Sequence, residues 1–120
     1  MQTMTAQRFT NVITEESELR GIFGDVSERA VKKQIDRLDV HCRAIIKKCP
    51  FILLGTSNTE GRCDVSPKGD YPGFVRVLDD RTIAIPDLPG NNRLDTLRNM
   101  IANPQVGLIF MIPGMNETLR

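Results

Sequence analysis

The sequence predicts an α+β protein in which helices come first and a small antiparallel barrel or sheet follows. Before Pro50, apolar residues recur at helical spacing, whereas the segments after Pro50 are short, rich in strand-forming residues and separated by turn-forming residues. The sequence contains neither a G-x-G-x-x-G motif nor a regular alternation of strands and helices. These observations favour short hairpins with one inserted helix over a dinucleotide-binding parallel sheet.

The composition is that of one ordinary globular domain of 120 residues. Sixteen Lys and Arg against 15 Asp and Glu give a net charge of +1, without the basic excess typical of nucleic-acid-binding proteins. No apolar run approaches the ~20 residues that cross a bilayer. The first eight residues lack the apolar core of a signal peptide. We therefore expect a cytoplasmic protein that binds neither nucleic acid nor membranes.

The three cysteines, Cys42, Cys49 and Cys63, are too few and too irregularly spaced for a disulfide framework. Reduced thiols are expected, and a bridge from Cys63 to one of the other two is the alternative. Together with the single histidine, His41, they do not give the ligand spacing of a zinc site, so no metal is expected. His41 lies in a predicted helix near its apolar face, and we interpret it as structural rather than catalytic.

Three helices are predicted before Pro50. Residues 15–23 form the first, which Gly24 closes, and Ser27 caps the second. Asp36 is expected to cap the third, which runs to residue 48 and shares one apolar face among Leu38, Cys42, Ile45 and Ile46. The basic residues of these helices are interpreted as solvated surface: Arg29, Lys32, Lys33, Arg43, Lys47 and Lys48.

Two hairpins are predicted next. Residues 51–56 and 62–66 form the first, around a turn at residues 58–61, with Cys63 and Val65 on the opposite face from Arg62, Asp64 and Ser66. Residues 67–73 are too rich in proline and glycine for regular structure. Residues 74–78 and 82–85 form the second hairpin, with a turn at Asp79 and Asp80.

The last third of the chain carries the inserted helix. After a loop at residues 86–90, a helix is expected over residues 92–102, with an apolar stripe of Leu94, Leu97, Met100 and Ile101. A strand over residues 105–112, a turn at residues 113–116 and the beginning of another strand at residues 117–120 follow. Since a natural domain rarely ends inside a hairpin, we expect the chain to be a fragment of a longer protein.

Residues 89–93, Pro-Gly-Asn-Asn-Arg, are the strongest candidate for ligand binding. They stand between a strand and a helix, where unpaired N–H groups and the helix dipole favour anions. Asn91 and Asn92 offer amide donors, and Arg93 offers a guanidinium that fits a phosphate. The alternative is that Asn91 or Asn92 is an ordinary helix cap and Arg93 a solvated side chain.

Residues 64–70, Asp-Val-Ser-Pro-Lys-Gly-Asp, are the second candidate. A strand that breaks into a proline- and glycine-rich loop can direct Ser66 and Lys68 into a cleft, where Lys68 would stabilise negative charge on a ligand. The alternative is a surface loop with a solvated lysine.

Six segments, taken in order, resemble the pyridoxamine 5'-phosphate oxidase-like, FMN-binding split-barrel superfamily. The closest likeness is to its branch of probable FMN-dependent enzymes of unknown substrate, and it covers about residues 28 to 120. The segments are residues 38–43, 51–57, 64–70, 84–87, 90–96 and 103–110.

The resemblance implies an antiparallel split β-barrel over residues 51–120, on which a helical segment of residues 1–50 packs within a single domain. It implies a homodimer that holds FMN at its interface. The phosphate would lie at Asn91, Asn92 and Arg93, with Thr96, and the ring at the strand and loop opposite. The implied ring-contacting residues are Ser66, Pro67, Lys68 and Gly69, with Pro86 and Asp87 facing them.

Two departures from the family pattern matter. Pyridoxamine phosphate oxidase has a Ser-Arg-Lys run where this chain has Asn91-Asn92-Arg93, so the phosphate grip is less charged and a vitamin B6 substrate is not assigned. Family members also continue past the position of Arg120 into strands that close the barrel. The ring-stacking residue is open, with Tyr71 and Phe74 as candidates.

The leading function implied by the resemblance is an FMN-dependent oxidoreductase that transfers hydride to or from an unknown small molecule. The alternatives are a flavin-binding module without turnover, a split barrel that uses deazaflavin or haem, and an α+β interaction domain without a cofactor. No catalytic residue is assigned, because the flavin itself carries the chemistry.

Overall fold

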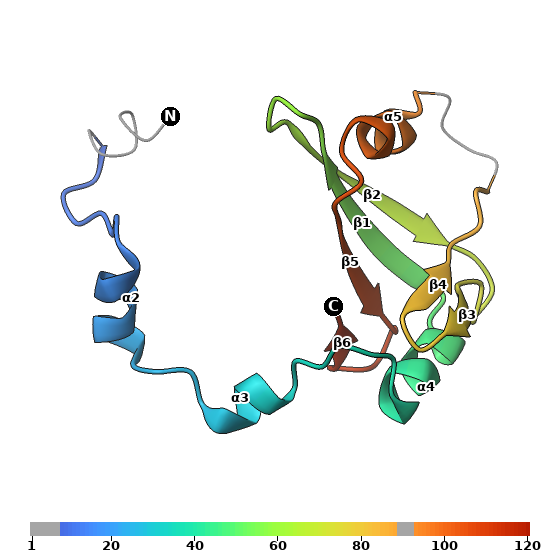
Figure 1. Ribbon diagram of the computed structural model, residues 1–120, viewed down its shortest axis with the longest axis horizontal. Helices are drawn as coiled ribbons and strands as arrows, with labels where there is room; N and C mark the ends of the chain where they lie inside the picture. The colour runs from blue at the N-terminus through green and yellow to red at the C-terminus, as the bar shows by residue number, and fades with distance from the viewer. Residues whose placement is uncertain (1–7, 89–92) are drawn as a thin grey trace. The chain divides into compact units, whose positions relative to one another are not determined.

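The computed structural model describes residues 8–88 and 93–120. The chain forms two compact units, residues 1–35 and residues 36–120 (Figure 1). Within the described residues, no helix has both the length and the apolar character needed to cross a bilayer.

From residue 8 onward, the N-terminal unit contains the short helices α2 (Glu16–Phe23) and α3 (Glu28–Lys32). α2 ends where Gly24 adopts a positive φ of 73° and donates its N–H to the carbonyl of Arg20 at 2.7 Å. α3 begins where the Ser27 hydroxyl accepts the N–H of Ala30 at 3.2 Å. Both predicted helices and their terminal residues are confirmed.

The second unit begins with α4 (Val40–Lys48), which is capped by Asp39 and not by Asp36. The Asp39 carboxylate accepts the N–H of Cys42 at 2.9 Å. The prediction of Asp36 was wrong because this segment is held elsewhere: Leu38 donates its N–H to the carbonyl of Asp80 at 2.7 Å, and Asp36 pairs with Arg81 at 3.2 Å. These contacts hold residues 36–38 outside the helix, with a bend at residues 36 and 37.

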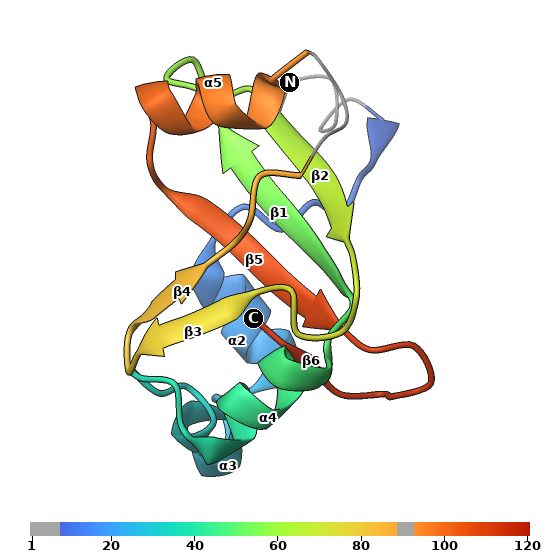
Figure 2. The same ribbon diagram turned by 90° about the vertical axis from the view of Figure 1, so that its right-hand side faces the viewer.

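A four-stranded antiparallel sheet forms the centre of this unit, in the order β2-β1-β5-β6 (Figure 2). Its strands are β1 (Phe51–Ser57), β2 (Cys63–Gly69), β5 (Val106–Met111) and β6 (Thr118–Leu119). β3 (Arg76–Asp79) and β4 (Thr82–Ala84) form a separate hairpin. The α+β class with antiparallel strands is confirmed. Among the described residues no ladder joins the two sheets, so the barrel is open there.

β2 is longer than predicted. It continues through Pro67 and Lys68 to Gly69, which pairs with Phe51. The expectation of irregular structure from residue 67 was wrong because β2 is an edge strand, where a proline loses no ladder hydrogen bond. The loop starts only at Asp70, and this extension carries Lys68 onto the sheet.

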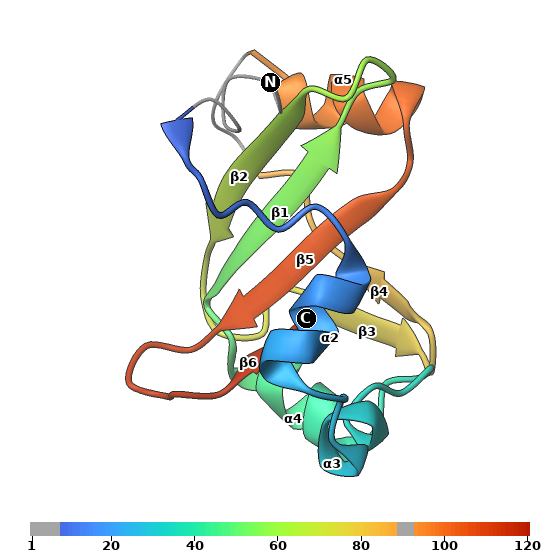
Figure 3. The same ribbon diagram turned by 90° about the vertical axis from the view of Figure 1, so that its left-hand side faces the viewer.

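The hydrophobic core lies at one end of the sheet, between α4, the β3–β4 hairpin and the start of β1. Its buried centre consists of Ile46, Cys49, Ile52, Val75 and Phe110. Ile52 and Phe110 are directly opposite each other on β1 and β5, the two central strands seen from the other side in Figure 3. The core therefore fixes this end of the sheet, and the opposite end, toward Ser57, is covered by α5 (Asp95–Ala102).

Candidate functional site

A cavity of about 390 Å³ lies between β2, the loop after β4 and the start of α5. This volume is within the roughly 300–1,000 Å³ usual for small-molecule sites. We call it the β2–α5 cavity. It is lined by Asp64, Val65, Ser66, Pro67, Lys68, Gly69, Pro86, Asp87, Leu88, Arg93, Leu94, Asp95, Thr96 and Leu97.

β2 supplies the polar wall of the cavity through its alternation. Asp64, Ser66 and Lys68 are half-buried, while the residues between them are exposed. They lie opposite Thr56, Leu54 and Ile52 of β1, whose side chains are buried. Since side chains opposite each other share a face of the sheet, one carboxylate, one hydroxyl and one ammonium follow each other along the inner face of β2.

The start of α5 supplies the second wall. Leu94 precedes the helix in a left-handed conformation, with a φ of 60° that a non-glycine residue adopts at an energetic cost. Arg93 Nε forms an ion pair with Asp95 Oδ2 at 3.2 Å. The helix was expected from residue 92 and begins at Asp95, because this turn at Leu94 delays it.

Hydrogen bonds hold α5 to the sheet. Thr96 Oγ1 donates to Asp64 Oδ2 at 3.4 Å, and Asn99 Nδ2 donates to Thr56 Oγ1 at 3.0 Å. Beyond the last turn, Asn103 Nδ2 donates to Ser57 Oγ at 3.1 Å. These donors are three and four residues apart, so they lie along one helical face, and the residue of α5 that is buried is Thr96.

The apolar stripe predicted to bury α5 faces outward for the most part. Ile101 is 87% exposed, Leu94 is 52% exposed and Leu97 is 37% exposed. The prediction followed the usual rule that the apolar face of a helix faces the core, and it was wrong here because the polar face makes the contacts with the sheet. Leu94 and Leu97 instead border the β2–α5 cavity.

The structure brings together the predicted site residues that it describes. The β2–α5 cavity is lined by all eight: Ser66, Pro67, Lys68, Gly69, Pro86, Asp87, Arg93 and Thr96. Asn91 and Asn92, together with Gly90, lie outside the described residues. Two separate segments that were predicted to face each other therefore border one space.

The sequence reasoning missed several lining residues. Asp64 and Asp95 add carboxylates to that of Asp87, so three acidic side chains accompany Lys68 and Arg93. Asp64 could have been found from the strand alternation that selected Ser66 and Lys68. Leu88, Leu94 and Leu97 were not predicted to line a site. Leu94 and Leu97 had been interpreted as part of the apolar stripe of the helix.

Neither aromatic candidate for ring stacking lines the cavity. Tyr71 is 84% exposed, and Phe74 packs against the hydrophobic core. Apolar faces are provided instead by proline and aliphatic side chains: Val65, Pro67, Pro86, Leu88, Leu94 and Leu97.

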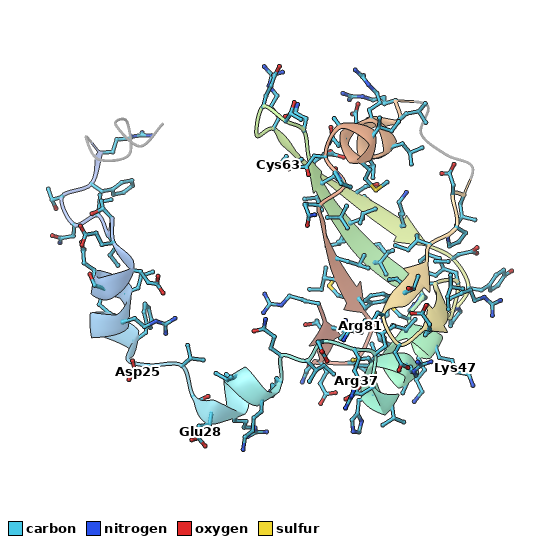
Figure 4. The ribbon with its side chains drawn as sticks, viewed as in Figure 1. Asp25, Glu28, Arg37, Lys47, Cys63 and Arg81 are labelled. Atoms are coloured by element: carbon cyan, nitrogen blue, oxygen red, sulfur yellow. The ribbon has the colours of Figure 1, made fainter. Side chains whose placement is uncertain are left out.

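The cysteines and His41 lie outside the cavity lining. Cys42 and Cys49 are buried, and Cys49 Sγ donates to the carbonyls of Phe51 and Met111 at 2.9 Å and 3.2 Å. Burial raises the pKa of the Cys42 thiol. Cys63 is at the other end of the β1–β2 ladder, as Figure 4 shows, and all three thiols are unbridged.

Within residues 8–88 and 93–120, no group of three or more His, Cys, Asp or Glu side chains is arranged to hold a metal ion.

Comparison of the chain with models of known protein families finds a match to one family. The family model described as pyridoxamine 5'-phosphate oxidase matches residues 38–120, which is the whole of α4, both sheets and α5. No curated protein and no solved structure matches the chain.

Proposed function

Because the chain belongs to the pyridoxamine 5'-phosphate oxidase-like family of flavin-binding split barrels, we propose that it binds FMN in the β2–α5 cavity and acts as an FMN-dependent oxidoreductase. The substrate is a small molecule that the sequence and the cavity do not identify. FMN supplies hydride transfer when bound, so the protein's task is to bind and orient it.

The observation that carries this proposal is the meeting of two sequence segments in one cavity. Residues 66–69 were expected at the ring, and Arg93 and Thr96 were among the residues expected at the phosphate. All of these border the same space of about 390 Å³. A surface loop with a solvated lysine would not require Lys68 to be half-buried beside the start of α5.

The donors of the cavity fit a phosphorylated ligand with a polar chain and a flat ring. Lys68 and Arg93 provide positive charge, and the hydroxyl of Ser66 provides a neutral donor. The aliphatic side chains of the rim provide apolar contact for a ring. A phosphate must compete with Asp95 for Arg93, so this site would hold an anion less strongly than a purely basic one.

The lining residues are expected to have different roles toward the bound flavin. Lys68, on the inner face of β2, would stabilise negative charge that a bound ring gains on reduction. Thr96 would hold the Asp64 carboxylate against α5 through the hydrogen bond that its hydroxyl donates. No protein acid or base is assigned, which agrees with the position of His41 outside the lining.

Haem is less suitable than a flavin for this cavity. Among the described lining residues there is no His, Cys, Met or Tyr, the side chains that ligate haem iron. Deazaflavin shares the phosphate and the ring, and its absorbance spectrum separates it from FMN. A binding module without turnover would bind FMN but would not cycle with an electron donor and acceptor.

We also propose that two copies of the chain associate. Val65 and Leu94 border the cavity and are 63% and 52% exposed, and Ile101 extends the same helix with 87% exposure. Covering such side chains is favourable by about 25 cal/mol per Å² of apolar surface. A second copy over this rim would also shield a bound ring from water.

The test is an absorbance spectrum of the purified protein before and after addition of FMN, followed by anaerobic addition of NADH or NADPH. We expect flavin bands at near-stoichiometric occupancy, bleaching by one donor, and recovery on addition of an acceptor. Binding without bleaching by any donor would favour the non-catalytic module. No binding would contradict the proposal.

A further inference from the structure

A second cavity, of about 470 Å³, lies between α4 and β3. It shares no lining residue with the β2–α5 cavity, and the family comparison assigns it no role. We call it the α4–β3 cavity. It is lined by Arg43, Ile46, Lys47, Pro72, Gly73, Val75, Arg76 and Val77.

The lining of this cavity carries three cationic side chains and no carboxylate. Arg43 and Lys47 come from successive turns of α4, and Arg76 comes from the start of β3. Figure 4 labels Lys47 near the end of α4, beside β3. All three side chains are exposed, as the sequence predicts for Arg43 and Lys47. The packing of α4 on β3 brings Arg76 to them.

The ordinary roles of these side chains do not account for the cluster. Arg43 is fixed by two contacts, Nη2 to Asp80 Oδ1 at 2.7 Å and Nε to the carbonyl of Leu38 at 3.1 Å. A guanidinium has further N–H donors beyond these two. Lys47 complements the negative end of the helix dipole, as lysines in a last turn commonly do.

Arg76 has no comparable role. Within the described parts of the chain, neither Arg76 nor Lys47 forms an ion pair. Three like charges around one space repel each other, and a bound anion would remove that repulsion.

The lining also has an apolar part, and its two sides are held close together. Ile46 and Val75 belong to the buried core, and Pro72 and Val77 complete the apolar part of the lining. At Gly73, where φ is +82°, an added Cβ would lie 2.8 Å from the carbonyl oxygen of Lys47. The loop backbone therefore contacts α4 directly, and this contact fixes the distance between the two walls.

We propose that the α4–β3 cavity binds a small organic anion. Its phosphate or carboxylate group is held by Arg43, Lys47 and Arg76, and its apolar body lies on Pro72 and Val77. The inference rests on this cavity alone and holds whether or not FMN binds elsewhere.

The test is an NMR titration of the full chain, in which the chemical shifts of the backbone amides report binding. Phenyl phosphate and benzoate are the two anionic probes. Benzyl alcohol is the neutral probe of similar shape. We expect either anion to shift the amides of Gly73, Val75 and Arg76, and the neutral probe to leave them unchanged. The stronger of the two anions identifies the preferred group.

Arg76→Gln is the decisive variant, and Arg62→Gln is its control. Arg62 is an exposed arginine in the β1–β2 turn, at the other end of the sheet, so both variants lose the same charge. Arg76→Gln is expected to raise the dissociation constant at least tenfold, and Arg62→Gln to leave it unchanged. If Arg76→Gln fails to fold, Lys47→Gln takes its place with the same expected loss.

Three results would overturn the inference: equal binding by the two variants, equal binding of benzyl alcohol, or shifts confined to Ser66 and Lys68. The last result would place the probes in the β2–α5 cavity. It would remove the second site and leave the proposed flavin function intact.

Discussion

At the scale of single residues, Lys68 has the most direct link to the proposed chemistry. It is half-buried on the inner face of β2 and lines the β2–α5 cavity. An ammonium group near a bound ring favours the state of the ring that carries more negative charge. The reduction potential of bound FMN should therefore depend on this side chain.

Lys68→Ala is expected to lower the reduction potential of bound FMN by about 30 mV, a tenfold change for a two-electron couple. Lys68→Arg should keep most of the wild-type potential, because it keeps the charge. Spectroscopic titration against a reference dye measures all three proteins. Lys48→Ala, which removes an exposed lysine of α4 outside both cavities, should have no effect. Identical potentials for Lys68→Ala and Lys48→Ala would contradict the assigned role.

Asp39 gives a prediction about pH and stability. The backbone N–H of Cys42 donates to its carboxylate and holds the pKa of Asp39 below its ordinary value of 3.8. The folded state thus binds this proton more weakly than the unfolded state. The contribution to stability is fully present above pH 3.8 and is lost as the pH falls through the lower, folded-state value.

Asp39→Asn keeps a capping oxygen but cannot titrate. Wild type should therefore lose thermal stability relative to Asp39→Asn as the pH is lowered below 3.8, while Asp39→Ala should be less stable than both at neutral pH. Melting temperatures across this range provide the measurement. Asp70→Asn controls for the loss of a carboxylate that caps no helix. A parallel pH response in wild type and Asp39→Asn would show that this cap is not the cause.

At the scale of elements, α5 is unusual because its polar face holds it to the sheet. Its contacts with β1 and β2 include hydrogen bonds from Thr96 and Asn99. A net contribution of about 1 kcal/mol for each hydrogen bond is typical. Such an attachment is weaker than a packed apolar face, so the wall of the β2–α5 cavity should respond to small changes in these bonds.

Thr96→Val tests this attachment at the cavity. The substitution keeps the shape of the side chain and removes its hydrogen bond to Asp64. We expect a loss of about 1 kcal/mol in the free energy of unfolding and a weaker affinity for FMN. Ser57→Ala removes the hydrogen bond from Asn103, outside the cavity lining, and should lower stability without changing FMN affinity. Equal FMN affinity in the two variants would show that the Thr96 hydrogen bond does not contribute to FMN binding.

The elements also show how far the sequence determines this structure. The Ser27 cap and the Gly24 terminus were predicted correctly. Both depend on hydrogen bonds between residues three or four positions apart, which the nearby sequence is sufficient to predict. Asp36 was mistaken for the cap of α4 because its actual partner, Arg81, is distant in the sequence. The strand through Pro67 could not be predicted without knowing that β2 is an edge.

The candidate site was predicted better than the elements around it. Residue types that suit an anion selected Lys68 and Arg93, and the family resemblance added Pro86, Asp87 and Thr96. The structure places these residues around one cavity. Its other acidic members and its aliphatic members were missed, because the direction of α5 depends on hydrogen bonds to Thr56, Ser57 and Asp64. The α4–β3 cavity gave no signal, since its three cations come from two separate elements.

At the scale of the whole molecule, the exposed apolar side chains of α5 and β2 favour association of two copies. Ile101→Glu places a charge at the most exposed of them without touching the core. Sedimentation velocity should show a dimer for wild type and a shift toward monomer for Ile101→Glu, with unchanged far-UV circular dichroism. Val31→Glu, a change at an exposed apolar residue of α3 in the N-terminal unit, is the control. A monomeric wild type would contradict the association.

The central claim is that the β2–α5 cavity binds FMN, and the most direct measurement is a titration of FMN fluorescence with wild type, Lys68→Glu and Lys48→Glu. The two variants make the same change of charge, and only Lys68 lines the cavity. The account predicts saturable quenching at one FMN per chain for wild type and Lys48→Glu, with affinity reduced at least tenfold in Lys68→Glu. Absence of saturable binding, or equal affinity in the two variants, would contradict it.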